Sequence, residues 1–353
     1  MVICLCGLIA AHLSHNNTYG DIQMNFPFKR IVAPLSVAII ALAANAAMAA
    51  NDVAVVVKIG GIPWFNAMEV GIKKAGSELG IESWMVGPTE ADAAQQVRAV
   101  EDLIARKVKV IAVVPNDAKA LEPVFKRAHD AGIKIITHES PDQKNGDWNI
   151  ELTTVAGFGE RHMESLAKAM GGKGKYAVFV GSLTVPLHNA WADAAIAYQK
   201  KKYPDMVQVS DRFGVAESLD DSYRTTQDLM RANPDLKGVL AFGSQGPIGA
   251  GRAVLEQRKA DKVAVVGPFS PGQGAKLIKE GGIREGFIWN PMLAGEVIVR
   301  IGKLLEDGKE PTDGMEIPGL GKVGVNKATH NILGQKLEAI NKETIDKLVS
   351  MGL

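Results

Sequence analysis

The chain has 353 residues, of which 46% are hydrophobic and 22% are charged, and its formal net charge at pH 7 is +1. This length is typical of about two domains. A charge balance so close to zero leaves no basic surface to hold a phosphate backbone, so nucleic-acid binding is disfavoured.

Residues 1–49 predict a secretory signal peptide. Lys29 and Arg30 form a basic pair, residues 31–44 are nearly all apolar, and an A-x-A pattern ends at Ala49. The apolar run of roughly 14 residues is shorter than the ~20 that a membrane-spanning helix needs. We therefore expect export and cleavage after Ala49; the alternative is an N-terminal membrane anchor.

The basic pair also bears on where translation starts. It lies far from Met1 but just after Met24, so we expect translation to start at Met24 and residues 1–23 not to be translated. Cys4 and Cys6 are the only cysteines and precede the cleavage site. The exported chain is thus expected to have no disulfide, catalytic thiol, thiolate-bound metal or lipid-anchored cysteine.

From residue 53 onward, short runs rich in Val and Ile alternate with amphipathic stretches of helical length. Val53–Val57 predicts a buried strand, and Ala67–Leu79 has apolar residues at helical spacing before Gly80 ends it. The same pattern predicts further strands at 83–86, 110–114, 134–137, 176–180, 207–213, 238–242, 263–266 and 284–289. It predicts further helices at 91–105, 118–131, 158–170, 191–203, 219–232, 248–257, 272–279 and 291–305. The tail predicts short strands at 315–317 and 322–325 and a last helix at 339–351.

This alternation indicates an α/β fold. Strands that alternate with helices of this length form βαβ units and parallel sheets. The strand runs are apolar on both faces, as expected where helices cover both sides of a sheet. Roughly 300 residues are too many for one core, so we expect two doubly wound, Rossmann-like lobes.

A candidate binding site follows from the residues just after the strands. In open α/β sheets, ligands bind beyond the carboxyl ends of the strands. The residues expected there combine aromatic rings with planar polar groups, which suits a sugar, because its C–H faces stack on rings and its hydroxyls need donors and acceptors. The candidate ligand-binding residues are Lys58, Trp64, Phe65, Asn66, Asp117, Glu139, His188, Gln245, Phe269, Trp289 and Asn290.

Several of these residues have a purely structural alternative. Trp64 and Phe65 could fill the first strand–helix junction, and Asp117 could cap the helix that follows it. Lys58 could be a solvated strand end, His188 a loop residue without a role, and Glu139 part of an inter-lobe crossover. Phosphate-loop, nucleophile-elbow and zinc-protease motifs are absent from the sequence, and no pair of histidines after the predicted cleavage site has metal-ligand spacing on a helix. We therefore expect no enzymatic activity, cofactor or metal.

The order of these residues resembles the periplasmic sugar-binding proteins of ABC importers, of the ribose-binding type. Pro63-Trp-Phe65 is similar to that family's first ligand loop, and Pro115-Asn-Asp117 to a turn whose aspartate binds sugar hydroxyls. Asn290 falls near a ligand-binding amide of the family. The resemblance implies a type I periplasmic binding fold, with two lobes joined by three crossovers. We expect lobe 1 to comprise 50–138 and 291–322, and lobe 2 to comprise 139–290 and 323–353.

Within that family the chain is most similar to the autoinducer-2 and rhamnose-binding branch. Residues 87–90 and 317–325 carry this likeness, whereas Leu187-His188 replaces the branch's Asp-Gln pair and Phe242-Gly-Ser244 also differs. We therefore expect a pentose, a deoxyhexose or a related polyol as ligand. The alternative is autoinducer-2, for uptake or signalling.

The resemblance also implies a location and partners. A soluble, monomeric periplasmic protein is expected, which closes its lobes on a small carbohydrate and docks on an ABC permease and its ATPase. A chemoreceptor is a further candidate partner. Two other classes of protein are alternatives. A transcription regulator would need a helix-turn-helix where the signal peptide is predicted, and an exported sugar-modifying hydrolase would need a nucleophile or metal set.

Overall fold

A computed structural model describes residues 52–353, and the predicted signal peptide and start at Met24 lie outside these residues. The first of its two main sheets has seven strands in the order β14-β15-β5-β4-β3-β1-β2, all parallel except β14. Its strands are β1 (Asp52–Val56), β2 (Glu82–Val86), β3 (Val110–Val113), β4 (Lys134–His138), β5 (Trp148–Glu151), β14 (Gly324–Asn326) and β15 (Asn331–Leu333).

The second main sheet is parallel, with the order β10-β9-β6-β7, and β8 also pairs with β6. Its strands are β6 (Gly174–Val180), β7 (Met206–Gln208), β8 (Phe213–Gly214), β9 (Leu236–Phe242) and β10 (Ala264–Val266). In the first sheet β1 lies between β2 and β3, and in the second sheet β6 lies between β7 and β9. The strand order therefore reverses at each of these two strands, and open α/β sheets form a crevice at the carboxyl ends of the strands at such a point.

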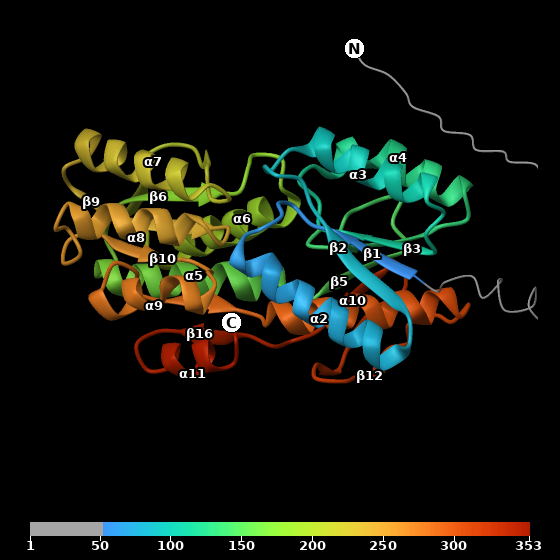
Figure 1. Cartoon of the computed structure of the whole chain (residues 1–353). Coiled ribbons are helices and arrows are strands. Elements are labelled where there is room, and N and C mark those ends of the chain that lie inside the picture. Colours follow the sequence, from blue (N-terminus) through green and yellow to red (C-terminus); the bar gives the residue numbers. More distant parts are fainter. Residues whose placement is uncertain (1–51) are drawn as a thin grey trace, which may run out of the picture. The chain divides into compact units, whose positions relative to one another are not determined.

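Helices cover both faces of each sheet. In the first sheet, Val53 and Val55 face the core shared with α2 (Pro63–Leu79) and α10 (Pro291–Glu306), while Ala54 and Val56 face α3 (Ala93–Ala105) and α4 (Ala118–Asp130) (Figure 1). In the second sheet, α5 (Val155–Met170) and α6 (Pro186–Lys202) form one packed pair, and α7 (Leu219–Ala232) and α8 (Gly246–Glu256) form the other. Alternate strand residues thus reach opposite cores, as continuous apolar strands require.

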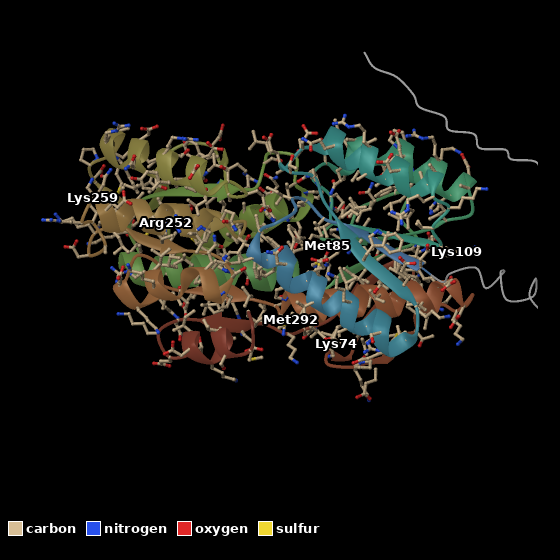
Figure 2. All side chains as sticks on the ribbon, in the orientation of Figure 1. Lys74, Met85, Lys109, Arg252, Lys259 and Met292 are labelled. Atoms are coloured by element: carbon tan, nitrogen blue, oxygen red, sulfur yellow. The ribbon has the colours of Figure 1, made fainter. Side chains whose placement is uncertain are left out.

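The remaining elements connect these layers or lie beside them. They are α9 (Pro271–Glu280), α11 (Ile345–Ser350), the antiparallel pair β11 (Gly286–Ile288) and β16 (Glu338–Ile340), and the short hairpin of β12 (Glu316–Ile317) and β13 (Gly321–Lys322). Charged side chains such as Lys109 and Arg252 are exposed on the surface (Figure 2). Among residues 52–353, no helix is long and apolar enough to cross a bilayer.

Some elements differ from the sequence-based expectation. Residues 148–151 form β5, which the sequence pattern does not predict, because this buried strand contains Asn and Glu and lacks an apolar run. The predicted strand 207–213 is two short strands, β7 and β8. The predicted helix 339–351 is only α11, since residues 338–340 pair with β11 instead.

Sheet pairing also bears on the expected lobes. β5 pairs with β4, and β15 pairs with β5, so residues 148–151 and 324–333 extend the first sheet. The expected boundaries at 138 and 322 assigned these strands to the second lobe. Three segments run from the first sheet to the second or back, at 152–154, 289–290 and 334–337. The division into lobes remains a prediction, with these segments as its hinge.

A buried histidine gives the fold an acid-sensitive point. His162 on α5 is fully buried; its Nδ1 faces the Phe158 carbonyl oxygen at 2.8 Å, and its Nε2 accepts from the Phe287 N–H at 3.1 Å. Burial is the largest effect on the ring and lowers the pKa of His162 to about 4. The imidazole therefore stays neutral in the folded protein over a range in which the unfolded chain, with a pKa near 6.5, takes up a proton.

We expect this group to make the free energy of unfolding fall by about 3 kcal/mol as the pH drops from 6.5 to 4, because the unfolded state binds more protons there. Stability from this source is fully present above pH 6.5. Urea unfolding of wild type and His162→Gln at pH 8, 6, 5 and 4 measures it, with pH 8 fixing the variant's intrinsic cost. If the free energy of unfolding falls equally with pH in the two proteins, His162 is not the group responsible for the loss of stability.

Candidate ligand-binding site

A cavity lies where the carboxyl ends of both sheets face each other. Its empty volume is about 320 Å³, including its opening. The lining residues follow strands of both sheets and are Lys58, Trp64, Phe65, Glu139, His188, Trp191, Glu217, Gly243, Ser244, Pro268 and Trp289.

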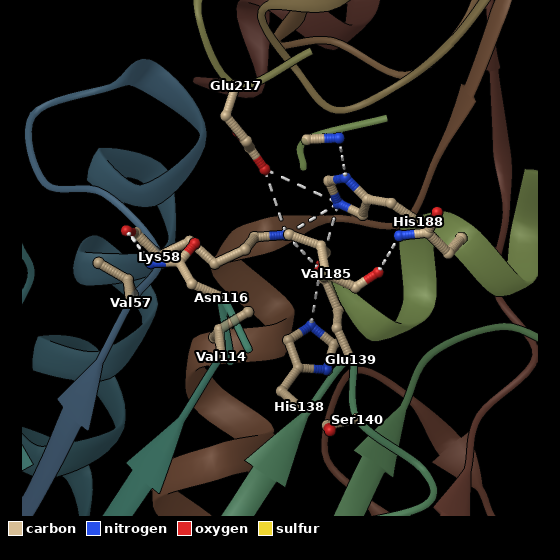
Figure 3. A network of polar contacts seen from close by, with 12 residues as sticks. Val57, Lys58, Val114, Asn116, His138, Glu139, Ser140, Val185, His188 and Glu217 are labelled. Carbon is tan, nitrogen blue, oxygen red and sulfur yellow. Dashed lines mark hydrogen bonds and ion pairs between the residues drawn. The ribbon is translucent and has the colours of Figure 1, made fainter. Parts of the chain in front are cut away.

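Four of these residues, which we call the Lys58 cluster, meet at one lysine: Lys58, Glu139, His188 and Glu217 (Figure 3). Lys58 Nζ donates to Glu139 Oε2 at 2.6 Å and lies 3.3 Å from Glu217 Oε1. It also lies 2.8 Å from His188 Nε2. Each of these side chains is at most 4% exposed. Because Lys58 follows β1 and both His188 and Glu217 belong to the second sheet's side, this lysine joins the two halves of the site.

Burial and charge act in opposite directions in this cluster. Burial is the largest single effect on Lys58 and lowers its pKa, but Glu139 and Glu217 together outweigh it and leave the pKa raised. Burial likewise raises the pKa of Glu139, but Lys58 and His188 outweigh it and hold that pKa well below its usual range. Lys58 and Glu139 therefore form an ion pair at neutral pH. Burial lowers the pKa of His188, so its ring is neutral there.

Local structure fixes the two members of the ion pair. The Asn116 side chain donates to the Lys58 carbonyl oxygen at 2.8 Å, and Gln96 of α3 donates to the carbonyl oxygens of Val57 and Val114. Glu139 ends β4 in a left-handed conformation, with φ at 63°. A glutamate held there by its surroundings stores strain, a feature that concentrates at functional sites.

Aromatic rings form the other wall of the cavity. The centroid of Trp289 lies 5.5 Å from those of both Trp64 and Trp191, at interplanar angles of 89° and 55°. The ring of His188 stacks on Trp191 at 5.3 Å. Such faces bind apolar C–H surfaces well.

Three lining residues also carry polar atoms that need partners. Trp191 Nε1, Trp289 Nε1 and Glu217 Oε2 are buried and have no hydrogen-bond partner among residues 52–353. Buried polar groups are normally paired, so these atoms are suited to contact a bound molecule. The cavity thus combines aromatic faces with unpaired donors and an unpaired acceptor. Within the same part of the chain, no group of three or more His, Cys, Asp or Glu could hold a metal ion.

Six of the eleven candidate residues from the sequence line this cavity. They lie just after β1, at the start of α2, just after β4, on α6 and just after β11, and are Lys58, Trp64, Phe65, Glu139, His188 and Trp289. Of the pair Leu187-His188, Leu187 turns into the core and only His188 reaches the cavity. Trp64 and Phe65 both fill the strand–helix junction and line the cavity, so the two alternatives for them coexist.

The other five candidates lie outside the lining. Asp117 and Asn290 cap helices α4 and α10, accepting from Lys119 N and Ala120 N and from Met292 N and Leu293 N. Asn66 donates weakly to the Gly61 carbonyl oxygen at the surface. Gln245 pairs with Gln273, and Phe269 is fully buried in the core. A strand-end position places a residue near the sheet edge but does not decide which way its side chain turns.

The sequence reading missed five lining residues: Trp191, Glu217, Gly243, Ser244 and Pro268. Glu217 lies three residues after β8 and directly before Ser218, the N-cap of α7, so the strand-end rule applied to this strand would have found it. Trp191 lies one helical turn beyond His188 on α6, a spacing that also indicates the same face. For Pro268, position after β10 was the only signal.

Comparison with known proteins bears on both fold and site. The chain matches the family described as periplasmic binding protein domain over residues 53–310. It is 28% identical over 254 residues to a ribose import binding protein of Salmonella typhimurium, with 70% of this chain and 81% of that protein covered. It is 26% identical over 233 residues to a D-apiose import binding protein of Paraburkholderia graminis, covering 63% and 71%.

Solved structures show the same fold. An ABC transporter solute-binding protein from Clostridium phytofermentas with bound L-rhamnose superposes with a TM-score of 0.80 at 21% identity, covering 86% of this chain and 99% of that one. LsrB from Clostridium saccharobutylicum in complex with AI-2 gives 0.78 at 19% identity, covering 84% and 99%. The expected type I periplasmic binding fold is confirmed by these comparisons.

Proposed function

The chain belongs to the periplasmic binding protein domain family, and from this premise we propose that it binds a small sugar or polyol for an ABC importer. Its relatives are solute-binding proteins of ABC transporters and not enzymes, so the bound molecule is expected to leave unchanged. Uptake through an ABC permease follows from the family. The ligand is proposed to be a pentose, a deoxyhexose or a related polyol.

The observation that carries this proposal is the chemistry of the cavity wall. Rings of Trp64, Trp191 and Trp289 offer surfaces for the C–H face of a sugar, while Lys58 and Glu217 offer charged donors and acceptors for its hydroxyls. We propose that Lys58, Trp64, Phe65, Glu139, His188 and Trp289, with Trp191 and Glu217 added, contact the ligand.

Location and assembly are proposed at two levels. The family is periplasmic, which is the setting we adopt for this chain. Cleavage of a signal peptide after Ala49 remains a proposal, which mass spectrometry of the exported protein would check. A monomeric state and a chemoreceptor as second partner are also proposals. Light scattering tests the monomeric state. Capillary chemotaxis of cells with and without the protein tests the chemoreceptor partner.

A thermal-melt panel on the purified protein tests the proposed function. The probes are D-ribose, D-allose, D-apiose, D-arabinose, L-rhamnose, xylitol and autoinducer-2, with sucrose as a disaccharide control. A ligand at ~1,000 times its dissociation constant adds about 4 kcal/mol of stability, a shift of several degrees. A shift with one monosaccharide or polyol and none with sucrose supports the proposal. No shift with any probe, repeated by calorimetric titration, would contradict it.

A further inference from the structure

The ring of His188 lies between two hydrogen-bond donors. The backbone N–H of Gly181 points at Nδ1 with a separation of 3.1 Å, and the Lys58 ammonium lies 2.8 Å from Nε2. A neutral imidazole has one N–H and one nitrogen with a lone pair, whereas an imidazolium has two N–H groups. His188 can therefore accept a hydrogen bond from only one of these two neighbours.

Geometry decides which neighbour is satisfied. Gly181 directly follows β6, so its N–H is held by the sheet and cannot turn away. Lys58 ends a flexible chain and has Glu139 at 2.6 Å and Glu217 at 3.3 Å as charged partners. We therefore assign the lone pair to Nδ1 and the proton to Nε2, which faces the cavity and the lysine. With this assignment, Lys58 Nζ and His188 Nε2 are both hydrogen-bond donors, so their contact is the one unfavourable contact of the Lys58 cluster.

Glu217 supplies the complementary acceptor. Its Oε1 lies 3.3 Å from Lys58 Nζ and 3.7 Å from His188 Nε2, and its Oε2 has no partner among residues 52–353. Gly181 allows both side chains to approach, since a Cβ there would lie 2.8 Å from Glu217 Cγ and 2.9 Å from His188 Nδ1. Glu139 Oε2 also lies 3.6 Å from His188 Nε2, but it already accepts from Lys58 at 2.6 Å. Glu217 is therefore the carboxylate beside the two donors that has an unpaired oxygen among residues 52–353.

A single hydroxyl matches this arrangement, because its oxygen accepts two hydrogen bonds and donates one. We propose that Lys58, His188 and Glu217 form a socket for one ligand hydroxyl, which accepts from Lys58 and His188, donates to Glu217 and separates the two donors. This inference rests on the proposed function. It adds a specificity rule, that the ligand must carry a free hydroxyl at one position, with its deoxy and O-methyl analogues rejected at least about 100-fold.

The first test needs no ligand. Protein labelled with ¹⁵N-histidine is studied at pH 7.5 by long-range ¹H–¹⁵N correlation, and the signals lost in His188→Gln, or in His188→Phe if the first variant does not fold, identify His188. We expect the Nε2–H tautomer for His188. His162 serves as the internal control with the opposite tautomer, because its Nδ1 faces a carbonyl oxygen and its Nε2 accepts from a backbone N–H. An Nδ1–H or doubly protonated His188 would overturn the socket.

The second test measures the specificity rule with the panel probe that gives the largest thermal shift. Calorimetric titration compares this probe with its monodeoxy and mono-O-methyl analogues, in wild type and His188→Phe. One position should show a loss of at least about 100-fold in wild type and a much smaller loss in the variant. Equal losses in both proteins would contradict the socket. If no probe binds, the proposed function fails, while the tautomer still decides the geometry on which the socket rests.

Discussion

Lys58→Met is expected to lower the free energy of unfolding by about 3–5 kcal/mol at pH 7. The variant leaves Glu139 and Glu217 buried, each with a side chain only 4% exposed, and removes the one ammonium that lies between them. Removing one partner of a buried ion pair leaves an uncompensated charge, which costs far more than the pair contributes. Urea unfolding measures the change, and the panel sugar should no longer bind detectably.

Two controls separate this mechanism from a general loss of a lysine. Lys74→Met removes a half-exposed lysine that pairs with Glu296 on the surface, and we expect no measurable change in stability. The variant Lys58→Met/Glu139→Gln/Glu217→Gln removes all three charges and should recover most of the loss, because replacing a whole buried ion cluster is often neutral. A Lys58→Met protein as stable as wild type would show that the carboxylates are not left charged and buried.

Glu217→Gln is expected to raise the dissociation constant of the panel sugar by about 10- to 100-fold while leaving stability unchanged or slightly higher. A hydrogen bond to a charged group contributes about 1.5–3 kcal/mol, and the amide offers one acceptor where the carboxylate offers two. Stability is preserved because Lys58 keeps Glu139 at 2.6 Å as its closest partner. Calorimetric titration gives the affinity, and thermal melting without ligand gives the stability.

Asp117→Asn is the matched control, because the sequence proposed Asp117 as a ligand contact and the structure shows it capping α4. Asparagine caps helices about as well as aspartate, so both affinity and stability should stay near wild type. If Asp117→Asn weakens binding as much as Glu217→Gln, the site lies elsewhere than in the cavity described here.

The fold class could be predicted from the amino-acid sequence alone, and so could the sheet edge at which the cavity lies. Alternation between apolar strands and amphipathic helices requires parallel sheets that helices cover on both faces. In agreement with this, the neighbouring strand residues Val53 and Ala54 pack into two different hydrophobic cores, one on each face of the sheet. The rule that ligands bind at carboxyl strand ends then placed Lys58, Glu139 and Trp289 at the edge where the cavity lies. These inferences succeed because periodicity and strand direction are local properties of the chain.

Which of those residues contact one another could not be predicted from the sequence and depends on the tertiary fold. Lys58 is 81 residues from Glu139 and 130 from His188 in sequence, and their contacts depend on strand order and on how the two sheets face each other. The same local rule could not distinguish Glu217, whose side chain reaches the cavity, from Asp117 and Asn290, whose side chains turn back to cap helices. Side-chain direction at a strand end is set by competing hydrogen-bond partners, and those partners come from parts of the chain that only folding brings together.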